Sequence, residues 1–444
     1  MPSRPLAAIL TLGCKLNLAD SEEIARGLRA AGFDVVDRPC EADAYVVNTC
    51  SVTHVADQKS RRLIRSVRRL SPGAAVAVTG CHPQSAGFDA VRATGADLVV
   101  GTRDRDKAEI VAFLLDRQHQ GLSPQHSALA GSHPGDPAIR SSEAPAFRHT
   151  RAFIKAQEGC NDVCAFCIVP QTRGREESRS IAAVVAEVRT AEEMGVREVV
   201  ITGTQLGAWG RDLAPALTPH DLISGLLSQT EVSRIRFSSL QPQDITPGLL
   251  ALWEDPRLMP HFHLALQSGS EDVLRAMRRR YTAAGFAHAA ERIRAAVADV
   301  AITTDVIAGF PGETEADFED TLALCRAVGF ARLHCFPYSA RARTSAARMA
   351  GQVPPDVRRE RMSHLLGLGD ELSLAFRRCS GGRIRPVLWE TERELDGAMA
   401  WTGHSDNYIP VVMAGEGLRN RITPVRIGAP LGDGVRGEAA GTPL

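Results

Sequence analysis

The sequence lacks long apolar runs, an excess of either charge, and the cysteine density of a disulfide scaffold. Its apolar stretches have the length of a strand, whereas a membrane span needs about 20 apolar residues, so we expect no membrane anchor. The 52 Lys and Arg residues equal the Asp and Glu residues in number, which argues against a uniformly basic nucleic-acid surface but leaves local basic clusters open. Ten cysteines in 444 residues indicate metal-binding, catalytic or buried thiols. No signal-peptide pattern precedes the first strand, and we expect a cytoplasmic protein.

The order of strand-like and helix-like segments predicts an α/β fold class with three domains. Residues 1–117 alternate strands and helices, which predicts a parallel α/β sheet. Residues 118–145 are rich in Gln, His, Ser, Gly and Pro and predict a linker. Six further strand–helix units in residues 146–376 predict a partial (β/α)6 barrel. Short strands with Gly-rich turns in residues 379–442 predict a small all-β barrel.

The individual strands are expected where short apolar or alternating runs occur between turn signals. These are residues 7–13, 44–50, 75–80, 98–101, 152–157, 198–202, 234–240, 262–267, 301–307, 332–338, 383–390, 398–401, 408–413 and 423–427.

The strongest chemical signal is a C-x3-C-x2-C loop formed by Cys160, Cys164 and Cys167, which follows a predicted strand. In a barrel the loops after the strands form the reactive face. Three thiolates can bind three irons of a [4Fe–4S] cluster, and they leave one iron open to an outside ligand. A zinc site or buried cysteines are the alternatives, but zinc usually takes four ligands, often as two C-x2-C pairs.

Cys14, Cys50 and Cys81 form a second candidate set, because each follows a predicted strand of the amino-terminal sheet. The carboxyl ends of parallel strands share one edge, where ligands bind. We therefore expect these cysteines to converge and to hold a second cluster with an open iron. The alternative is that they are three small buried apolar residues. That reading is preferred for the remaining four cysteines, Cys40, Cys325, Cys335 and Cys379.

The cysteine loop followed by six strand–helix units resembles the radical S-adenosylmethionine superfamily. Taken with the Asn48-Thr49-Cys50 and Thr79-Gly80-Cys81 motifs, nearly the whole chain resembles the methylthiotransferases of that superfamily. The carboxy-terminal segment around Gly403–Tyr408 resembles the TRAM module, a small RNA-binding barrel.

The resemblance implies an enzyme that contains two [4Fe–4S] clusters and uses S-adenosyl-L-methionine both as methyl donor and as radical source. One cluster, held by Cys160, Cys164 and Cys167, would cleave the cofactor. The other, held by Cys14, Cys50 and Cys81, would carry the sulfur. Implied partners are tRNA and an electron donor such as flavodoxin or ferredoxin, and we expect a monomer without a membrane partner.

The substrate that the resemblance favours is N6-threonylcarbamoyladenosine at position 37 of tRNA, methylthiolated at C2. The segments Gly13–Asn17 and His334–Ser339, with the run after Cys50, are most similar to that subgroup. N6-isopentenyladenosine in tRNA and a ribosomal-protein aspartate are the alternative substrates. A non-catalytic iron–sulfur RNA-binding or electron-transfer protein is the alternative of a different class.

Further cofactor contacts are expected at strand ends. Thr202 and Gly203 would approach the methionine end of the cofactor, and Gly309 would line the adenine side. A strand-end turn and a tight loop are the corresponding structural explanations. Gln241 stands where the family often has a glutamate, which removes one carboxylate from the expected cofactor site.

RNA contacts are expected from three groups of arginines, with a solvated surface as the alternative for each. The groups are Arg61, Arg62, Arg65, Arg68 and Arg69; Arg278, Arg279 and Arg280; and Arg377, Arg378, Arg383 and Arg385. Trp401 and Tyr408 would either stack on bases or pack in the core.

Overall fold

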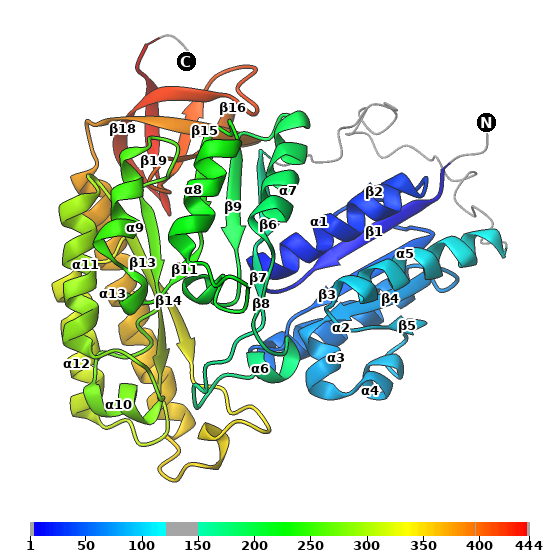
Figure 1. Ribbon diagram of the computed structural model, residues 1–444, viewed down its shortest axis with the longest axis horizontal. Helices are drawn as coiled ribbons and strands as arrows, with labels where there is room; N and C mark the ends of the chain where they lie inside the picture. The colour runs from blue at the N-terminus through cyan, green and yellow to red at the C-terminus, as the bar shows by residue number, and fades with distance from the viewer. Residues whose placement is uncertain (1–3, 121–149, 396, 442–444) are drawn as a thin grey trace. The chain divides into compact units, whose positions relative to one another are not determined.

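The computed structural model describes residues 4–120, 150–395 and 397–441, which form two compact units (Figure 1). The first unit contains the described residues before position 148 together with Ile168–Arg175. The second contains the described residues of His149–Cys167 and Glu176–Leu444. The expected linker lies outside the described residues except for positions 118–120, the first two of which end a helix. The domain limits named above remain predictions.

The first unit is built on a parallel five-stranded sheet in the order β2-β1-β3-β4-β5. Its strands are β1 (Leu6–Thr11), β2 (Asp34–Val36), β3 (Ala44–Thr49), β4 (Ala75–Gly80) and β5 (Leu98–Val99). Both faces of the central strands are buried, as expected of a parallel sheet covered by helices on either side. The prediction of a parallel α/β sheet is therefore confirmed.

Alternate residues of these strands pack against helices on opposite faces of the sheet. Val46 of β3 contacts the cluster formed with α1 (Lys15–Ala30) and α5 (Asp104–His119). Tyr45 and Val47 contact the cluster formed with α2 (His54–Leu70). The short helices of this unit are α3 (Cys81–Ala86), α4 (Phe88–Arg92) and α6 (Val169–Thr172).

Before the carboxy-terminal barrel, the described part of the second unit contains seven parallel strands, of which β10 and β11 are separated only by Ser238 and together take the place of one expected strand, so the prediction of a partial barrel with six strand–helix units is confirmed. The strands form two sheets in the orders β10-β9-β6 and β11-β12-β13-β14. The strands are β6 (Arg151–Lys155), β9 (Glu198–Thr202), β10 (Arg234–Phe237), β11 (Ser239–Leu240), β12 (His261–Leu264), β13 (Ala301–Ala308) and β14 (Arg332–Pro337). A separate antiparallel pair is formed by β7 (Gln157–Glu158) and β8 (Glu177–Ser178).

Helices follow the strands of the second unit, as the alternation in sequence predicts (Figure 1). They are α7 (Ile181–Glu193), α8 (Pro219–Gln229), α9 (Pro247–Ala251), α10 (Glu271–Ala276), α11 (Ala283–Ala296), α12 (Glu315–Val328) and α13 (Pro355–Cys379). Short 3₁₀ helices lie at Leu206–Ala208, Pro242–Asp244, Leu252–Glu254 and Ala346–Arg348.

The carboxy-terminal strands, drawn in orange to red in Figure 1, close into a five-stranded barrel in the order β15-β16-β17-β19-β18. They are β15 (Ile384–Leu395), β16 (Ala398–Ser405), β17 (Pro410–Ala414), β18 (Ile422–Leu431) and β19 (Gly434–Ala439). Trp389 and Trp401 pack in the core of this barrel. The all-β prediction is confirmed, and Trp401 is a core residue rather than an exposed base-stacking platform.

Several boundaries differ from the sequence prediction for local reasons. The strand expected over residues 234–240 is interrupted at Ser238. The strand expected to reach Gln267 ends at Leu264, and Gln267 adopts a positive φ of 70°. Tyr408 has a φ of 72°, so β17 begins two residues later than expected. The pattern also gave no indication of the edge strand β2, the long helix α13 or β19, which expose much of their length.

A buried charge cluster occupies the strand starts of the partial barrel and includes a residue of the carboxy-terminal barrel. Glu198 Oε1 and Oε2 accept hydrogen bonds from Arg236 at 3.1 Å, and Arg151 Nε lies 3.7 Å from Oε1. Arg236 also lies 4.4 Å from the centre of the Tyr408 ring. Burial opposes the ionisation of Glu198, yet the guanidinium groups of Arg236 and Arg151 hold its pKa at about 2.

Replacing Glu198 with glutamine should destabilise the second unit, because buried arginines would then lack their carboxylate. We expect the free energy of unfolding at pH 7 to fall by about 3–5 kcal/mol. The Glu198 contribution is present above its ordinary pKa of 4.5 and is lost as the pH falls from there towards 2. Denaturant unfolding of E198Q and of the exposed control E193Q, at several pH values, measures both effects; equal stability of the two variants would contradict this account.

Candidate functional site

Three predicted site cysteines, Cys14, Cys50 and Cys81, lie at one edge of the first unit, where the adjacent strands β1, β3 and β4 end. A Cβ placed on Gly13 would lie 3.1 Å from the Cβ of Cys50. The thiol of Cys50 interacts electrostatically with those of Cys81 and Cys14. All three are free cysteines, so the structure brings together the thiols that the sequence placed at equivalent strand ends.

Gly80 permits the close approach of β4 to β3 directly before Cys81. Its φ of 100° and ψ of −165° belong to a region that is essentially restricted to glycine. A Cβ at this position would lie 2.2 Å from the carbonyl oxygen of Thr49, the residue before Cys50. The glycine in the Thr-Gly-Cys motif is therefore required for the backbones that carry Cys50 and Cys81 to lie side by side.

Buried polar side chains fix the backbone around these cysteines. Asn17 Nδ2 donates to Asn48 Oδ1 at 2.8 Å and to the Thr49 carbonyl at 3.0 Å. The Cys50 carbonyl accepts a hydrogen bond from Ser60 Oγ at 3.1 Å. Side chains from α1 and α2 thus fix the end of β3, which leads into Cys50.

Burial disfavours the charged form of these thiols. It raises the pKa of Cys50 to about 11 and also raises the pKa of Cys81. Iron binds the thiolate, so metal binding at this edge is coupled to proton release. A positive charge close to the sulfurs favours that ionisation, and the Arg173 guanidinium, which forms a hydrogen bond with Cys81, supplies one.

The second cysteine set, Cys160, Cys164 and Cys167, lies in a loop that follows β7, and all three side chains are half-buried. The Asp162 N–H donates to Cys160 Sγ at 3.3 Å. Burial raises the pKa of Cys160 to about 11. The loop is fastened to the rest of the second unit through Ala165, whose N–H donates to the Met277 carbonyl at 3.0 Å.

Arg279 brings a positive charge to this loop. Its Nη1 donates to Cys164 Sγ at 3.3 Å, and its Nε donates to the Tyr281 hydroxyl at 2.9 Å. Burial raises the pKa of Tyr281 to about 12, so its hydroxyl remains protonated and donates to the Leu266 carbonyl at 2.8 Å. Arg279 was expected, with Arg278 and Arg280, to contact RNA or to form a solvated surface, whereas the structure places it against a cysteine sulfur.

Gln241 and Gln157 contribute further to the frame of the loop. Gln241 Nε2 donates to Asp162 Oδ2 at 3.2 Å, a contact that a glutamate in its place would not make. Gln157 Nε2 donates to the Gly159 carbonyl at 2.8 Å, and its Oε1 accepts the Gln205 N–H at 2.9 Å. The loop is thereby connected to the segment that follows β9.

Thr202 and Gly203 close β9 at the position expected for a cofactor contact. A Cβ on Gly203 would lie 2.8 Å from Leu206 Cδ2, so packing alone accounts for this glycine. Two hydroxyls just beyond the ends of β9 and β10, Thr204 Oγ1 and Ser238 Oγ, are buried and have no hydrogen-bond partner among the described residues. Sequence reasoning did not identify either hydroxyl, and both are suited to the polar groups of a bound cofactor.

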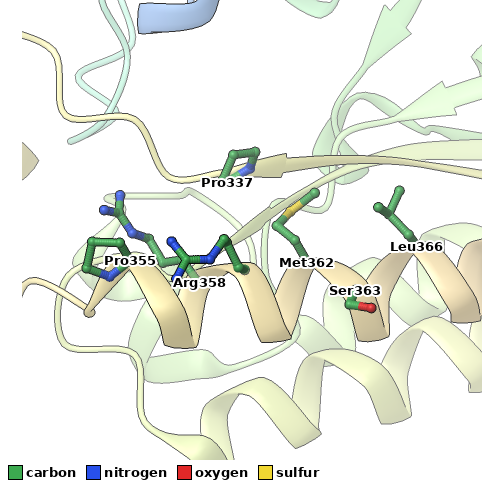
Figure 2. A pocket seen from close by; sticks show the side chains of 7 residues that line it. Pro337, Pro355, Arg358, Met362, Ser363 and Leu366 are labelled. Atoms are coloured by element: carbon green, nitrogen blue, oxygen red, sulfur yellow. The ribbon is translucent and has the colours of Figure 1, made fainter.

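Gly309, the third predicted cofactor contact, has a φ of 74°, and a Cβ there would lie 2.2 Å from Arg358 Cγ. A tight loop against α13 therefore explains this glycine without a ligand. Arg358 also lines a groove of about 530 Å³ between the end of β14 and the first turns of α13 (Figure 2). Pro337, Met362 and Leu366 give the groove a largely apolar lining, and it contains none of the predicted site residues.

The donor sets at both sites fit iron–sulfur clusters. Each site offers three free thiols and a guanidinium that contacts one of them. Soft thiolates are the usual ligands of such clusters. Among the described side chains, no three His, Cys, Asp or Glu residues converge as ligands of a single metal ion. The thiolates of a four-iron cluster each bind a different iron and do not require that convergence.

Family comparisons match both cysteine-bearing regions. Residues 7–101 match the family described as uncharacterized protein family UPF0004, and residues 154–325 match the radical SAM superfamily. The threonylcarbamoyladenosine tRNA methylthiotransferase MtaB of Bacillus subtilis is 36% identical over 95% of this chain and 93% of its own. A tRNA-2-methylthio-N(6)-dimethylallyladenosine synthase of Cereibacter sphaeroides is 37% identical over 98% of both chains.

Solved structures support the fold alone. The radical S-adenosylmethionine methyltransferase TsrM from Kitasatospora setae, with tryptophan and a cofactor analogue bound, matches with a TM-score of 0.53. Its sequence identity is 15%, and the match covers 89% of this chain and 79% of that one. None of the described helices is long and apolar enough to cross a membrane.

Replacing Gly80 with alanine should disturb the amino-terminal cysteine edge, because the added Cβ collides with the Thr49 carbonyl. We expect a loss of at least about 2 kcal/mol in the stability of the first unit and less iron after anaerobic reconstitution. Gly73→Ala is the control, since nothing lies within 4 Å of a Cβ at that position. Denaturant unfolding and iron analysis of both variants measure these effects. A G80A protein with the same stability and iron content as G73A would refute the role assigned to Gly80.

Proposed function

Because this chain belongs to the radical S-adenosylmethionine methylthiotransferase family, we propose that it methylthiolates C2 of N6-threonylcarbamoyladenosine at position 37 of tRNA. The observation that carries the proposal is the pair of separate three-cysteine sets, each at a strand-end loop and each with an arginine on one sulfur. A single cluster would suffice to cleave the cofactor. A second set is understandable if sulfur must also be held and methylated.

The proposed roles of the residues follow from their chemistry. Bound clusters supply the electron that cleaves S-adenosylmethionine and the sulfur that accepts its methyl group. Cys160, Cys164 and Cys167 would hold the first cluster, and Arg279 would orient Cys164. Thr204 and Ser238 would bind polar groups of the cofactor through their buried hydroxyls. Cys14, Cys50 and Cys81 would hold the second cluster.

The choice of threonylcarbamoyladenosine rests on the segments around Cys50 and His334 and on the similarity to the Bacillus subtilis relative. The match to the Cereibacter sphaeroides relative favours dimethylallyladenosine, which is the N6-isopentenyladenosine named above, as the second candidate substrate. We also propose an electron donor such as flavodoxin or ferredoxin, a monomeric state and a cytoplasmic location. The TRAM-like role of the carboxy-terminal barrel belongs to the same proposal.

Helix α2 provides a basic surface for the proposed tRNA partner. Lys59, Arg62, Arg65 and Arg69 are exposed along it, whereas Arg68 is partly buried and donates to the Gly95 carbonyl at 3.0 Å. Arg68 is therefore structural, which corrects the expectation that it belongs to the RNA-facing group.

The carboxy-terminal arginines are largely engaged within the protein. Arg377 is buried and donates to the Gly434 carbonyl, and Arg385 pairs with Asp406 at 2.7 Å. The exposed face of α2 remains the better candidate for phosphate contacts.

Deleting the gene should remove the methylthio derivative of threonylcarbamoyladenosine from the tRNA of the source organism. Mass analysis of tRNA nucleosides measures this, and a plasmid copy should restore the product unless it carries Cys160→Ala or Cys50→Ala. Loss of the dimethylallyladenosine derivative instead would establish the second candidate substrate. Unchanged tRNA would reject both.

An assay in vitro distinguishes the proposed enzyme from a non-catalytic iron–sulfur protein. Anaerobically reconstituted protein with dithionite and S-adenosylmethionine should release 5′-deoxyadenosine well above the Cys160→Ala control. Release equal to that control would favour the binding protein.

A further inference from the structure

Arg173 is a buried arginine at the amino-terminal cysteine edge, and the sequence analysis did not single it out. Its side chain is 2% exposed, and both terminal nitrogens donate to Asp20 Oδ2 at 3.2 Å. The guanidinium also forms a hydrogen bond with the Cys81 thiol. Burying a permanent charge is costly unless the charge is paired and hydrogen-bonded, and here the cysteine supplies one of the contacts.

A second contact connects Arg173 to Cys14. Asn17 Oδ1 accepts Arg173 Nη2 at 3.2 Å and also accepts Cys14 Sγ at 3.4 Å. Arg173 therefore touches one predicted ligand directly and a second through a single amide. The Thr172 hydroxyl, next to Arg173 in the chain, also forms a hydrogen bond with Cys81.

The fixed charge at this position has a predictable effect on a cluster held by the three thiolates. Guanidinium remains protonated at all accessible pH values and only donates hydrogen bonds. Hydrogen bonds to the sulfurs and nearby charges set the reduction potential of iron–sulfur clusters. A positive donor stabilises the reduced form, which carries one more negative charge. The negative charge of Asp20, which pairs with Arg173 and lies 3.4 Å from Lys107 Nζ, acts in the opposite direction.

We propose that Arg173 is the positioning residue of the amino-terminal site, which orients Cys81 and stabilises the reduced form of the cluster bound by Cys14, Cys50 and Cys81. The identity of that cluster rests on the proposed function, whereas the contacts of Arg173 do not. The simpler explanation is an ion pair with Asp20 that only fastens α6 to α1. The proposal predicts shifts of the midpoint potential in Arg173 and Asp20 variants, whereas a purely structural ion pair predicts no shift in any variant that still binds iron.

The test uses the full chain with Cys160, Cys164 and Cys167 replaced by alanine, so that only the amino-terminal cluster contributes to the signal. In this background the variants are Arg173→Met, Arg173→Lys and Asp20→Asn. The matched control is Arg175→Met, two residues away and exposed. After anaerobic reconstitution, iron per chain is measured, and the midpoint potential is determined by redox titration monitored by electron paramagnetic resonance.

Arg173→Met should shift the midpoint potential to a more negative value, and Asp20→Asn should shift it to a more positive value. Arg173→Lys should fall between Arg173→Met and the parent, and Arg175→Met should match the parent. If Arg173→Met binds no iron, a shift of Arg173→Lys to a more negative value than the parent and the positive shift of Asp20→Asn still decide the question. Potentials equal to the Arg175→Met control in every variant that binds iron would overturn the proposal.

Failure of the proposed function is visible separately. The potentials are measured in the background without Cys160, Cys164 and Cys167, and the tRNA product is measured in cells that carry the parental gene. If the shifts occur but the parental gene gives no methylthiolated tRNA, the role of Arg173 stands and the assigned reaction is wrong. If the parental gene gives the product while the potentials do not move, Arg173 is structural and the assigned reaction stands.

Discussion

The register of β1, β3 and β4 in the parallel sheet determines whether Cys14, Cys50 and Cys81 can act as one ligand set. Parallel strands end at a common edge, but common edges alone do not bring thiols within reach of one cluster. Gly80 allows β3 and β4 to approach more closely, because it has no Cβ that would collide with the backbone of Thr49. The amide of Asn17 then holds the end of β3 against α1.

Both cysteine sets share an electrostatic arrangement. Burial disfavours the ionised form of the thiols and so raises the pKa values of Cys50 and Cys160. Each set then has one arginine in contact with a sulfur, Arg173 in the first unit and Arg279 in the second. Buried thiolates are therefore favoured when a metal and the neighbouring arginine balance their negative charge. Without metal, the thiols are favoured in their protonated form.

The sequence predicted the parts of this structure that have a strong local signal. The strand–helix alternation predicted the sheet and the six-unit barrel, and β4 and β9 have the predicted limits. The grouping of the cysteines followed from the rule that strand ends share an edge. The arginine contacts did not follow, because nothing in the spacing distinguishes Arg173 or Arg279 from neighbouring surface arginines. Likewise, the burial of the unpaired hydroxyls of Thr204 and Ser238 results from tertiary packing, which no periodic pattern in the sequence indicates.

The central claim is that two independent sets of three thiols each hold a four-iron cluster. Iron and acid-labile sulfide per chain, measured on the anaerobically reconstituted protein and on the two triple Cys→Ala variants, test it most directly. The account predicts about eight irons in the parent chain and about four in either variant, as expected of two [4Fe–4S] clusters. Zinc in place of iron, or a variant that keeps the full iron content, would contradict it.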